Sequence, residues 1–358
     1  MSQTPAVPVF FHTEQLAFKP LYEWAFGEKI DHPETTARAE SILAAVEAEG
    51  PRFVIRQPSE VPLGALRQQH AMNLLTLYQA AEAQLEDDQT FYPMVFPREH
   101  SADPTNLHHA GAFCFDSGTP LAAQTLRAAG WSAACGKAAA VAVRKEGCKL
   151  AYALSRPPGH HATRGLFGGY CYFNNAGVAA RHLKRSGRVV VLDIDYHHGN
   201  GTQSLFWRDD KVFTISVHGD PRDVFPFFAG FAPETGGGRG QGYNLNIPLP
   251  RGLDGAAYFD VFDATVLPAI RTFAPDYLVV AAGFDTYKLD PVGHWAFETA
   301  DYHELGGRLA RLDVPTVAVQ EGGYYTPHLG ANAVAFLRGF DDVARSPYSA
   351  DKPRHTDE

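Results

Sequence analysis

Five short apolar runs recur along this chain, and a polar segment follows each of them. The runs are rich in Val, Ile, Leu and Ala and occupy residues 149–154, 189–194, 212–217, 277–282 and 315–319. Continuous apolar runs of this length are typical of strands that are buried on both faces, as in a parallel sheet. Helical patterns lie between the runs. The sequence therefore predicts a three-layer α/β fold with a mostly parallel central sheet and helices on both faces.

Two of the intervening helices have recognisable ends. Residues 174–184 form one candidate, in which Asn174 is placed to cap the start and Gly187 to end the element. Residues 38–49 form another, with Gly50 at its end. Ligands bind beyond the carboxyl ends of the strands in such sheets, so the polar segments after the apolar runs are expected to meet in one site.

Composition limits the classes of protein to which the chain can belong. With 358 residues and 45% hydrophobic content, it can form one large core, and we predict a single domain over residues 1–358 with a flexible tail from 346 to 358. A net charge of -9 argues against a nucleic-acid partner. No apolar stretch approaches the roughly 18 residues of a membrane span, and the four cysteines lack the spacing of a disulfide scaffold. We therefore expect a cytoplasmic protein with reduced thiols and no membrane partner.

The segment LDIDYHHGNG has the spacing of a metal site. Asp193, Asp195 and His197 fall at positions i, i+2 and i+4, so their side chains project from one face of an extended chain. Asp195 and His197 can share one ion, and Asp285, just after the run 277–282, completes a three-ligand set with an open position. Any one of these residues alone is more simply explained as a turn or capping residue. The complete set favours a metal site.

The tandem His160-His161 supplies a candidate general base and general acid, because imidazole titrates near neutrality. Asp193 can hold one imidazole and Asn200 the other. A charged partner favours the imidazolium form and a neutral partner does not. We therefore predict that His161, beside Asn200, is the base and that His160, beside Asp193, is the acid. Without their neighbours, tandem histidines would indicate only two surface or turn residues.

Tyr324 follows Gly322 and Gly323, which allow the backbone to direct the phenol across a site. Its hydroxyl can donate to a carbonyl oxygen that becomes an oxyanion. Alone, the motif indicates no more than a glycine turn with a packed tyrosine, and Tyr325 is a competing candidate. Together with the ligands and the histidine pair, it predicts hydrolysis at a one-metal site.

The chain resembles the zinc-dependent histone deacetylase family in five segments: RPPGHHA, GGYCYFNN, DIDYHHGNGTQ, AGFDTYKLDP and EGGYY. Within that family it is most similar to bacterial acetylpolyamine amidohydrolases, as seen in HGDPRDVFPFFAGFAPETG and EGGYYTPHLGANAVAFL. The likeness runs from about Pro33 to Phe340. It implies an arginase-like α/β fold and a catalytic zinc ion, with iron(II) as the alternative. The implied reaction is hydrolysis of an acetylpolyamine, an acetyl-lysine or a related small acetamide.

The same resemblance assigns roles to individual residues. It implies that Asp195, His197 and Asp285 bind the metal, that the histidine pair acts in acid-base catalysis, and that Tyr324 contacts the substrate carbonyl. It implies one structural potassium site at Asp193, Asp195, His197, Ser216 and Val217, and a second at Phe206, Asp209, Val212 and Tyr243. It also implies a substrate tunnel with Tyr170 and Phe225 as walls, Gly169 at the scissile amide and Arg38 at an internal channel below the metal. Phe227 is the alternative to Phe225.

The chain departs from the resemblance at the mouth of the tunnel. Polyamine-directed relatives place acidic residues there, but alignment gives His108 and Thr119 at those positions, and Val292 where a polyamine-selective relative has glutamate. A cationic amine would lack its partners, and a desolvated cation without a partner is costly. Asp103 and Asp116 in the same loop are the remaining candidates.

Two rival functions use the same residues. An arginase-like ureohydrolase needs a binuclear manganese cluster with more bridging aspartates, whereas the chain has one HH and one DxDxH motif. A catalytically silent module that binds acetylated amines is expected to have lost a ligand, a histidine or the tyrosine, and none is missing. The resemblance also implies a homodimer or homotetramer, with residues 12–33 as a candidate contact.

Overall fold

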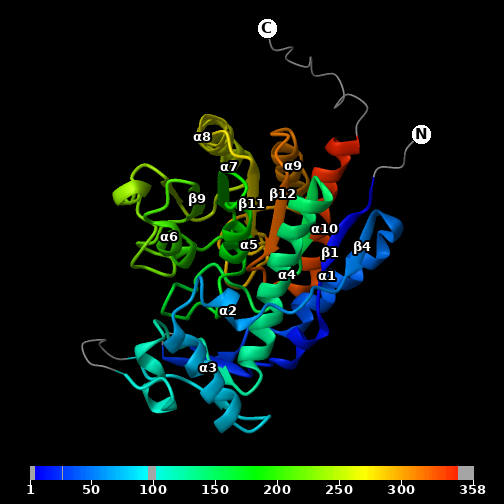
Figure 1. Cartoon of the computed structure of the whole chain (residues 1–358). Helices are drawn as coiled ribbons and strands as arrows, with labels where there is room; N and C mark the ends of the chain where they lie inside the picture. Colours follow the sequence, from blue (N-terminus) through cyan, green and yellow to red (C-terminus); the bar gives the residue numbers. More distant parts are fainter. Residues whose placement is uncertain (1–4, 26, 96–101, 346–358) are drawn as a thin grey trace.

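The structure is a computed structural model that describes residues 5–25, 27–95 and 102–345. The tail predicted at 346–358 lies outside the described residues. An eight-stranded sheet runs through the centre (Figure 1). Its strands are β1 (Val7–Phe10), β4 (Phe53–Arg56), β7 (Leu150–Ala153), β8 (Val189–Asp193), β9 (Val212–Gly219), β10 (Asn244–Leu249), β11 (Tyr277–Ala282) and β12 (Thr316–Gln320).

The strand order is β10-β9-β8-β11-β12-β7-β1-β4, and every neighbouring pair is parallel. Two short antiparallel pairs lie outside this sheet, β2 (Tyr22–Ala25) with β3 (Glu28–Asp31) and β5 (Thr90–Phe91) with β6 (Leu121–Ala122). The α-helices are α1 (Thr36–Ala48), α2 (Leu63–Leu66), α3 (Met72–Gln84), α4 (Thr125–Glu146), α5 (Asn175–Leu183), α6 (Asn200–Phe206), α7 (Gly255–Val261), α8 (Leu267–Phe273), α9 (Thr299–Ala310) and α10 (Thr326–Arg345).

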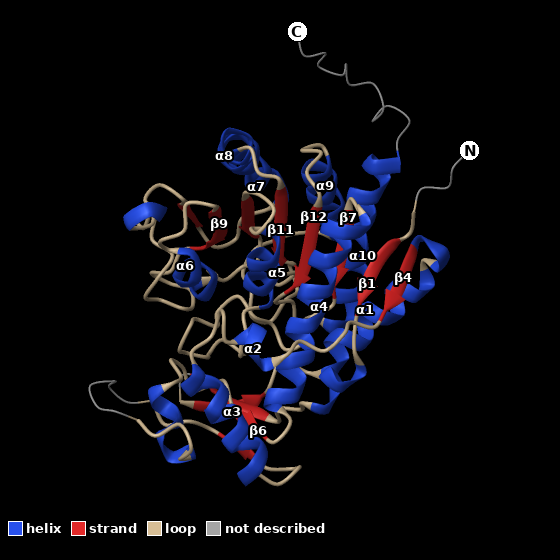
Figure 2. Ribbon diagram, in the orientation of Figure 1, coloured by secondary structure: helices blue, strands red, loops and turns tan. Residues whose placement is uncertain are grey.

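Alternate residues of the inner strands pack against different helix layers. In β8, Val190 and Leu192 join the core that includes α1 and α7 to α10, whereas Val189 and Val191 join the core that includes α4 and α5. Both faces of the sheet are therefore covered (Figure 2). All four side chains are fully buried, and burying a side chain of this size stabilises the fold by about 1.5 to 3 kcal/mol.

The structure confirms the five predicted strands and the three-layer α/β fold. Helix α5 confirms the Asn174 cap, whose side chain accepts a hydrogen bond from the backbone N–H of Gly177 (2.7 Å). The helix ends at Leu183 with Lys184 as its C-cap, so the prediction that Gly187 ends it is wrong. Helix α1 begins two residues before the predicted Arg38. Among the described residues, no helix has the length and hydropathy needed to cross a membrane.

Candidate active site

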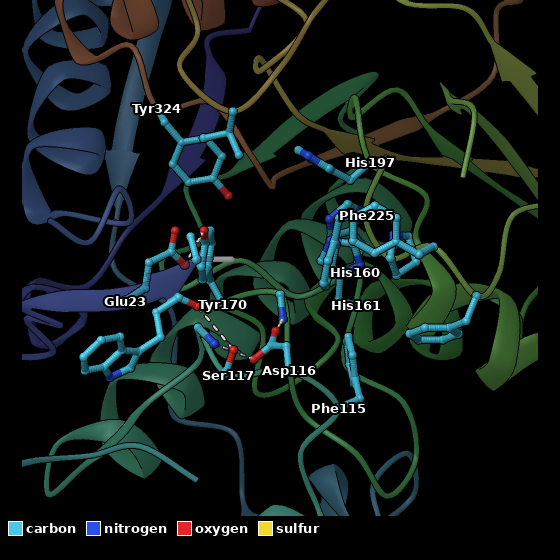
Figure 3. Close-up of a pocket in the computed structure, with 18 of the residues that line it drawn as sticks. Glu23, Phe115, Asp116, Ser117, His160, His161, Tyr170, His197, Phe225 and Tyr324 are labelled. Atoms are coloured by element: carbon cyan, nitrogen blue, oxygen red, sulfur yellow. Dashed lines mark hydrogen bonds between the residues drawn. The ribbon is translucent and has the colours of Figure 1, made fainter. Parts of the chain in front are cut away.

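Polar segments that follow four strands of the sheet meet at one edge. β7 and β8 precede the pair His160-His161 and the segment 193–197, while β11 and β12 precede Asp285 and Tyr324. The carboxyl ends of parallel strands share an edge, so these residues, distant in sequence, converge in space. Figure 3 shows both histidines, His197 and Tyr324 around one pocket.

The three predicted metal ligands form one buried group. Donor atoms of Asp195, His197 and Asp285 all lie within 4.8 Å of one another. The His197 Nδ1 atom lies 2.9 Å from Asp285 Oδ2 and 3.3 Å from Asp195 Oδ1. Strand β8 ends at Asp193, so the prediction of an extended strand through His197 is wrong. Asp193 and Asp195 instead accept hydrogen bonds from the backbone N–H two residues later in each case (3.1 and 2.9 Å).

This donor set suits a divalent cation. Two carboxylates, each with at most 1% of its surface exposed, lie against one imidazole. Among the ion pairs of the described residues, only histidines pair with Asp195 or Asp285. Buried carboxylates without a cation are strongly unfavourable, so the cluster needs positive charge. A Cβ atom at Gly322 would lie 2.5 Å from Asp195 Oδ2 and 2.6 Å from Asp285 Oδ2, which explains the glycine there.

The predicted partners of the histidine pair are in place. The Nδ1 atom of His160 donates to Asp193 Oδ2 (2.9 Å), and Nδ1 of His161 donates to Asn200 Oδ1 (2.7 Å). Burial alone would lower the pKa of His160, but the Asp193 carboxylate and then Asp195 raise it to about 10. Burial, followed by the neighbouring charge of His160, holds the pKa of His161 well below its usual value. The two imidazoles therefore favour opposite protonation states.

Sequence reasoning missed the carboxylate that holds this histidine segment. Glu321 is fully buried, and its Oε2 atom accepts hydrogen bonds from the backbone N–H of Gly159 (2.6 Å) and His160 (3.0 Å). Its position directly before Gly322-Gly323-Tyr324 was the available signal. Glu321, His160 and Cys171 also form a second group of potential ligands, but the Cys171 thiol donates to the Gly169 carbonyl (3.1 Å). Glu321 Oε2 and the Cys171 thiol thus have partners within the protein, whereas the buried Glu321 Oε1 atom has none among the described residues.

Tyr324 directs its hydroxyl into the pocket, between Tyr170 and His197 (Figure 3). No hydrogen bond within the described part of the chain involves this hydroxyl. Burial raises the pKa of Tyr324 well above its usual value, so the hydroxyl keeps its proton. The Arg38 guanidinium lies 4.6 Å from the centre of the Tyr324 ring, and its Nε donates to the Gly323 carbonyl (2.6 Å). Arg38 is thus behind Tyr324, not in the pocket wall.

The pocket has a volume of about 550 Å³ and a mainly aromatic wall. The predicted tunnel residues Gly169, Tyr170 and Phe225 all line it, and so does the alternative residue Phe227. The Phe225 ring is 5.0 Å from the His161 ring, centre to centre, whereas Phe227 is 46% exposed. Phe225 therefore lies closer to the histidine pair, and Phe227 lies closer to the mouth of the pocket.

Two carboxylates line the same pocket, Asp116 and one that lies outside the motifs of the sequence. Asp116 accepts from the backbone N–H of Gly118, Thr119 and Gly169 and from the Thr119 hydroxyl, so its oxygens are fully used. Asp103 is exposed, accepts from Thr105 and is not part of the wall. Neither His108 nor Thr119 lines the pocket.

The second carboxylate is Glu23, which comes from the hairpin of β2 and β3. It is 8% exposed, and its Oε2 atom accepts from the Tyr170 hydroxyl (2.8 Å; Figure 3). No ion pair of the described residues includes it. Burial, and then the nearby Asp116, raise the pKa of Glu23. Glu23 lies 137 residues before His160 and outside every motif, so no sequence pattern indicates its place in the pocket.

The residues predicted for the first potassium site lie at the end of β8, in the segment after it and inside the adjacent strand β9. Asp193 and Ser216 are register partners in β8 and β9 and line a small cavity of about 10 Å³. Asp195, His197 and Val217 do not line that cavity.

The residues predicted for the second potassium site lie near the connection between α6 and β9. The Phe206 carbonyl accepts from the backbone N–H of Asp209 (2.9 Å), and the Tyr243 carbonyl accepts from that of Thr214 (3.1 Å). Val212 is the first residue of β9. These carbonyls therefore already have backbone partners.

Comparison with known proteins agrees with this geometry. The histone deacetylase domain family matches residues 32–340, which include every active-site residue described above except Glu23. The chain belongs to the histone deacetylase family. Within the family, it is 41% identical to an acetylpolyamine amidohydrolase of Burkholderia pseudomallei (strain 1710b), over 92% of this chain and 98% of the relative. It is 38% identical to acetylpolyamine amidohydrolase 2 of Pseudomonas aeruginosa, over 87% of this chain and 92% of the relative.

Solved structures of the family share the fold. The crystal structure of an acetylpolyamine aminohydrolase from Burkholderia pseudomallei superposes with a TM-score of 0.88 and 38% identity, and it covers 94% of this chain and 99% of that chain. The expectation of a histone deacetylase fold with a strong likeness to the bacterial acetylpolyamine enzymes is therefore confirmed.

Proposed function

We propose that this chain is a metal-dependent amidohydrolase that removes the acetyl group from an acetylated amine. One observation carries the proposal: a buried Asp195-His197-Asp285 donor group and a differently held histidine pair meet at one pocket with the Tyr324 hydroxyl, which has no hydrogen-bond partner in the part of the chain that the structure describes. Relatives with 38 to 41% identity are named acetylpolyamine amidohydrolases. Zinc is the proposed ion, because its ligands are nitrogen and oxygen donors that leave one position open, and iron(II) is the alternative.

Asp195, His197 and Asp285 would hold the ion, which when bound supplies Lewis-acid polarisation of the amide carbonyl and acidifies a water molecule. His161 takes the water proton at Nε2, because its Nδ1 proton is directed at Asn200 Oδ1. Its lowered pKa keeps that nitrogen unprotonated before the reaction. His160 remains cationic beside Asp193 and gives a proton to the amine as it leaves.

Tyr324 donates its hydroxyl proton in a hydrogen bond to the carbonyl oxygen as negative charge develops there. The hydroxyl has no competing acceptor among the described residues, so it is available to the substrate. A donor preorganised in a site without bulk water stabilises an oxyanion far more than it would in water. Gly169 and Phe225 line the pocket on the side of His161 and would confine the acetamide group near the base.

Glu23 indicates that the amine is cationic. The buried Glu23 carboxylate has no ion-pair partner within residues 5–25, 27–95 and 102–345 and lies in an aromatic wall, and such a charge is stabilised by an incoming ammonium group. The aromatic rings around it also suit a cation. Glu23 therefore takes the role expected for the missing acidic residues, and an acetylated polyamine is the proposed substrate class, ahead of an acetyl-lysine side chain.

A kinetic panel tests both statements. Acetate release is measured with N-acetylputrescine, N-acetylspermidine, an acetyl-lysine peptide and the uncharged N-butylacetamide. Glu23→Gln keeps an acceptor for Tyr170 but removes the charge, and Glu28→Gln on the exposed strand β3 is the matched control. Loss of one charged hydrogen bond is worth about 1.5 to 3 kcal/mol, so kcat/KM for the polyamines should fall about 10-fold to 100-fold in Glu23→Gln.

The outcomes separate the function from the substrate class. With N-butylacetamide, Glu23→Gln should retain the wild-type kcat/KM, and Glu28→Gln should resemble the wild type with every substrate. Equal losses for charged and uncharged substrates would contradict the role of Glu23 in recognition. Absence of acetate release from all four compounds would contradict the amidohydrolase itself.

We further propose a potassium ion at the cavity beside Asp193 and Ser216, because the cavity is close to the volume that one water-sized particle needs.

We also propose a homodimer or homotetramer that uses the segment 12–33. The exposed apolar side chains of this segment, Leu21, Trp24 and Ile30, support a contact there. Sedimentation equilibrium of the wild type and of Trp24→Ser would test the oligomer. The four cysteines form no disulfide, which suits a cytoplasmic protein.

The two rival functions have no support of their own in the structure. A binuclear manganese centre needs additional bridging aspartates, and the second potential ligand group within the described chain contains a thiol, an imidazole and one carboxylate. A protein that only binds acetylated amines does not require two imidazoles with opposite protonation preferences. Release of urea with manganese, or binding of acetylated amines without turnover, would favour these alternatives.

A further inference from the structure

Asp290 is a buried carboxylate beside the pocket that has no part in the chemistry above. It is 7% exposed and accepts four backbone hydrogen bonds. Its Oδ2 atom accepts from the N–H of Tyr324 (2.6 Å) and Tyr325 (3.0 Å). Its Oδ1 atom accepts from the N–H of Val292 (3.0 Å) and Gly293 (3.3 Å).

These bonds join two separate parts of the pocket wall. Val292 lies in the loop after β11, Tyr324 lies after β12, and both line the pocket. The residues before Tyr324 have other partners, since Gly322 N–H donates to Asp195 Oδ2 (2.8 Å) and the Gly323 carbonyl accepts from Arg38. Asp290 is the acceptor for the N–H of Tyr324 itself. It therefore controls the point from which the phenol side chain leaves the backbone.

The carboxylate suits this position for two physical reasons. Hydrogen bonds to an ionised acceptor are roughly twice as strong as neutral ones, and one carboxylate can serve four donors. Helix α10 begins at Thr326, directly after the two tyrosine amides, and the positive end of a helix stabilises a nearby negative charge. An Asn side chain in place of Asp290 would offer one acceptor oxygen, and its NH2 group would face backbone N–H groups that are also donors.

We propose that Asp290 is a positioning residue that fixes the Tyr324 hydroxyl at the reacting carbonyl. The proposal rests on the proposed function, in which Tyr324 donates to the oxyanion. It concerns orientation, so Asp290 acts only through Tyr324 and has no contact with the substrate. Its loss should reduce turnover while substrate still binds, because Tyr324 would no longer meet the carbonyl in the transition state.

A double-mutant cycle distinguishes this role from simple stabilisation of the fold. N-acetylputrescine hydrolysis is measured for the wild type, Asp290→Asn, Tyr324→Phe and the double variant, with melting temperature and metal content for each. Asp290→Asn should lower kcat at least 10-fold and change KM less than 3-fold. In the Tyr324→Phe background, the same substitution should change kcat less than 2-fold, because the hydroxyl that it positions is already absent.

Asp254→Asn is the matched control, because Asp254 also accepts a backbone N–H, that of Ala257 (2.9 Å), but lies at the exposed start of α7. Because Asn caps a helix about as well as Asp, it should leave both kcat and the melting temperature close to those of the wild type. If Asp290→Asn does not fold, Asp290→Glu, which keeps both oxygens and the charge one methylene further out, takes its place in the cycle.

Each outcome bears on a different statement. Multiplicative losses in the double variant would overturn the positioning role, as would a loss confined to KM or to metal content. A Tyr324→Phe variant with full turnover would instead overturn the proposed role of Tyr324, and the amidohydrolase mechanism with it. Coupled losses with normal metal content would support the inference.

Discussion

Replacing Tyr324 by Phe removes a single oxygen atom and leaves the rest of the site unchanged. The ring retains its contacts with the Arg38 guanidinium 4.6 Å away and with the Tyr170 ring, whose centre is 5.8 Å from its own. Because the hydroxyl makes no hydrogen bond with any described residue, its removal leaves no buried partner unsatisfied. We therefore expect the free energy of unfolding to change by less than about 1 kcal/mol.

Catalysis should respond very differently. Losing one preorganised oxyanion donor costs about 2.7 to 4 kcal/mol of transition-state stabilisation, which corresponds to a roughly 100-fold to 1000-fold fall in kcat. KM should change little, because the hydroxyl is proposed to bind the oxyanion more strongly than the ground-state carbonyl. Burial raises the pKa of Tyr324, so the effect should be the same across neutral pH.

The assay is steady-state acetate release from N-acetylputrescine, with metal content and urea unfolding measured on the same samples. Tyr325→Phe is the matched control, because the Tyr325 ring is stacked on Tyr287, away from the pocket. A Tyr324→Phe variant with more than about a third of wild-type kcat would refute the reasoning. So would a variant that lost its metal, since Tyr324 is not among the proposed ligands.

Two further predictions concern a glycine and a buried histidine. A Cβ atom at Gly169 would lie 2.2 Å from His161 Cδ2, and Gly169 has φ +58°. Gly169→Ala should therefore lower kcat at least 10-fold in the acetate assay and lower the free energy of unfolding in urea by about 1 to 2 kcal/mol. An unchanged kcat would mean that Gly169 does not constrain His161. Burial lowers the pKa of His70 to about 3 in the folded protein. The neutral imidazole therefore contributes fully to stability above the pKa of about 6.5 in the unfolded chain, and this contribution is lost as the pH falls below 6.5. Between pH 7.5 and 5.5, the free energy of unfolding of the wild type should therefore fall by about 1.4 kcal/mol more than that of His70→Gln. If the two free energies of unfolding change in parallel with pH, the buried imidazole is not neutral.

The parts of the fold that could be predicted are those in which burial alone dictates the residue type. Strands β8, β11 and β12 are covered on both faces and are almost wholly apolar, so their runs were visible. Strands β1, β4 and β10 were missed. β1 and β10 are interrupted by Pro or Asn, and β4 and β10 are the edge strands of the sheet, where one side of the backbone needs no partner strand.

The same division applies to the site. Asp195, His197, Asp285 and the histidine pair lie in the segments that follow strands β8, β11 and β7, so the topology of a parallel sheet was enough to bring them together. Glu23 was not predictable, because a separate hairpin carries it to the pocket and its importance comes from burial with no ion-pair partner among the residues that the structure describes. The role of Asp290 depends on four backbone N–H groups, and no side-chain pattern reports on backbone hydrogen bonds.

The central claim is that one metal ion at Asp195, His197 and Asp285 is required for amide hydrolysis, and metal reconstitution tests it most directly. Chelator-treated protein is titrated with zinc while bound metal and acetate release from N-acetylputrescine are measured together. Activity should rise in proportion to bound zinc and reach its limit at about one ion per chain, while Asp285→Ala should bind no ion and stay inactive. Full activity of the metal-free protein, or full metal content in Asp285→Ala, would contradict the claim.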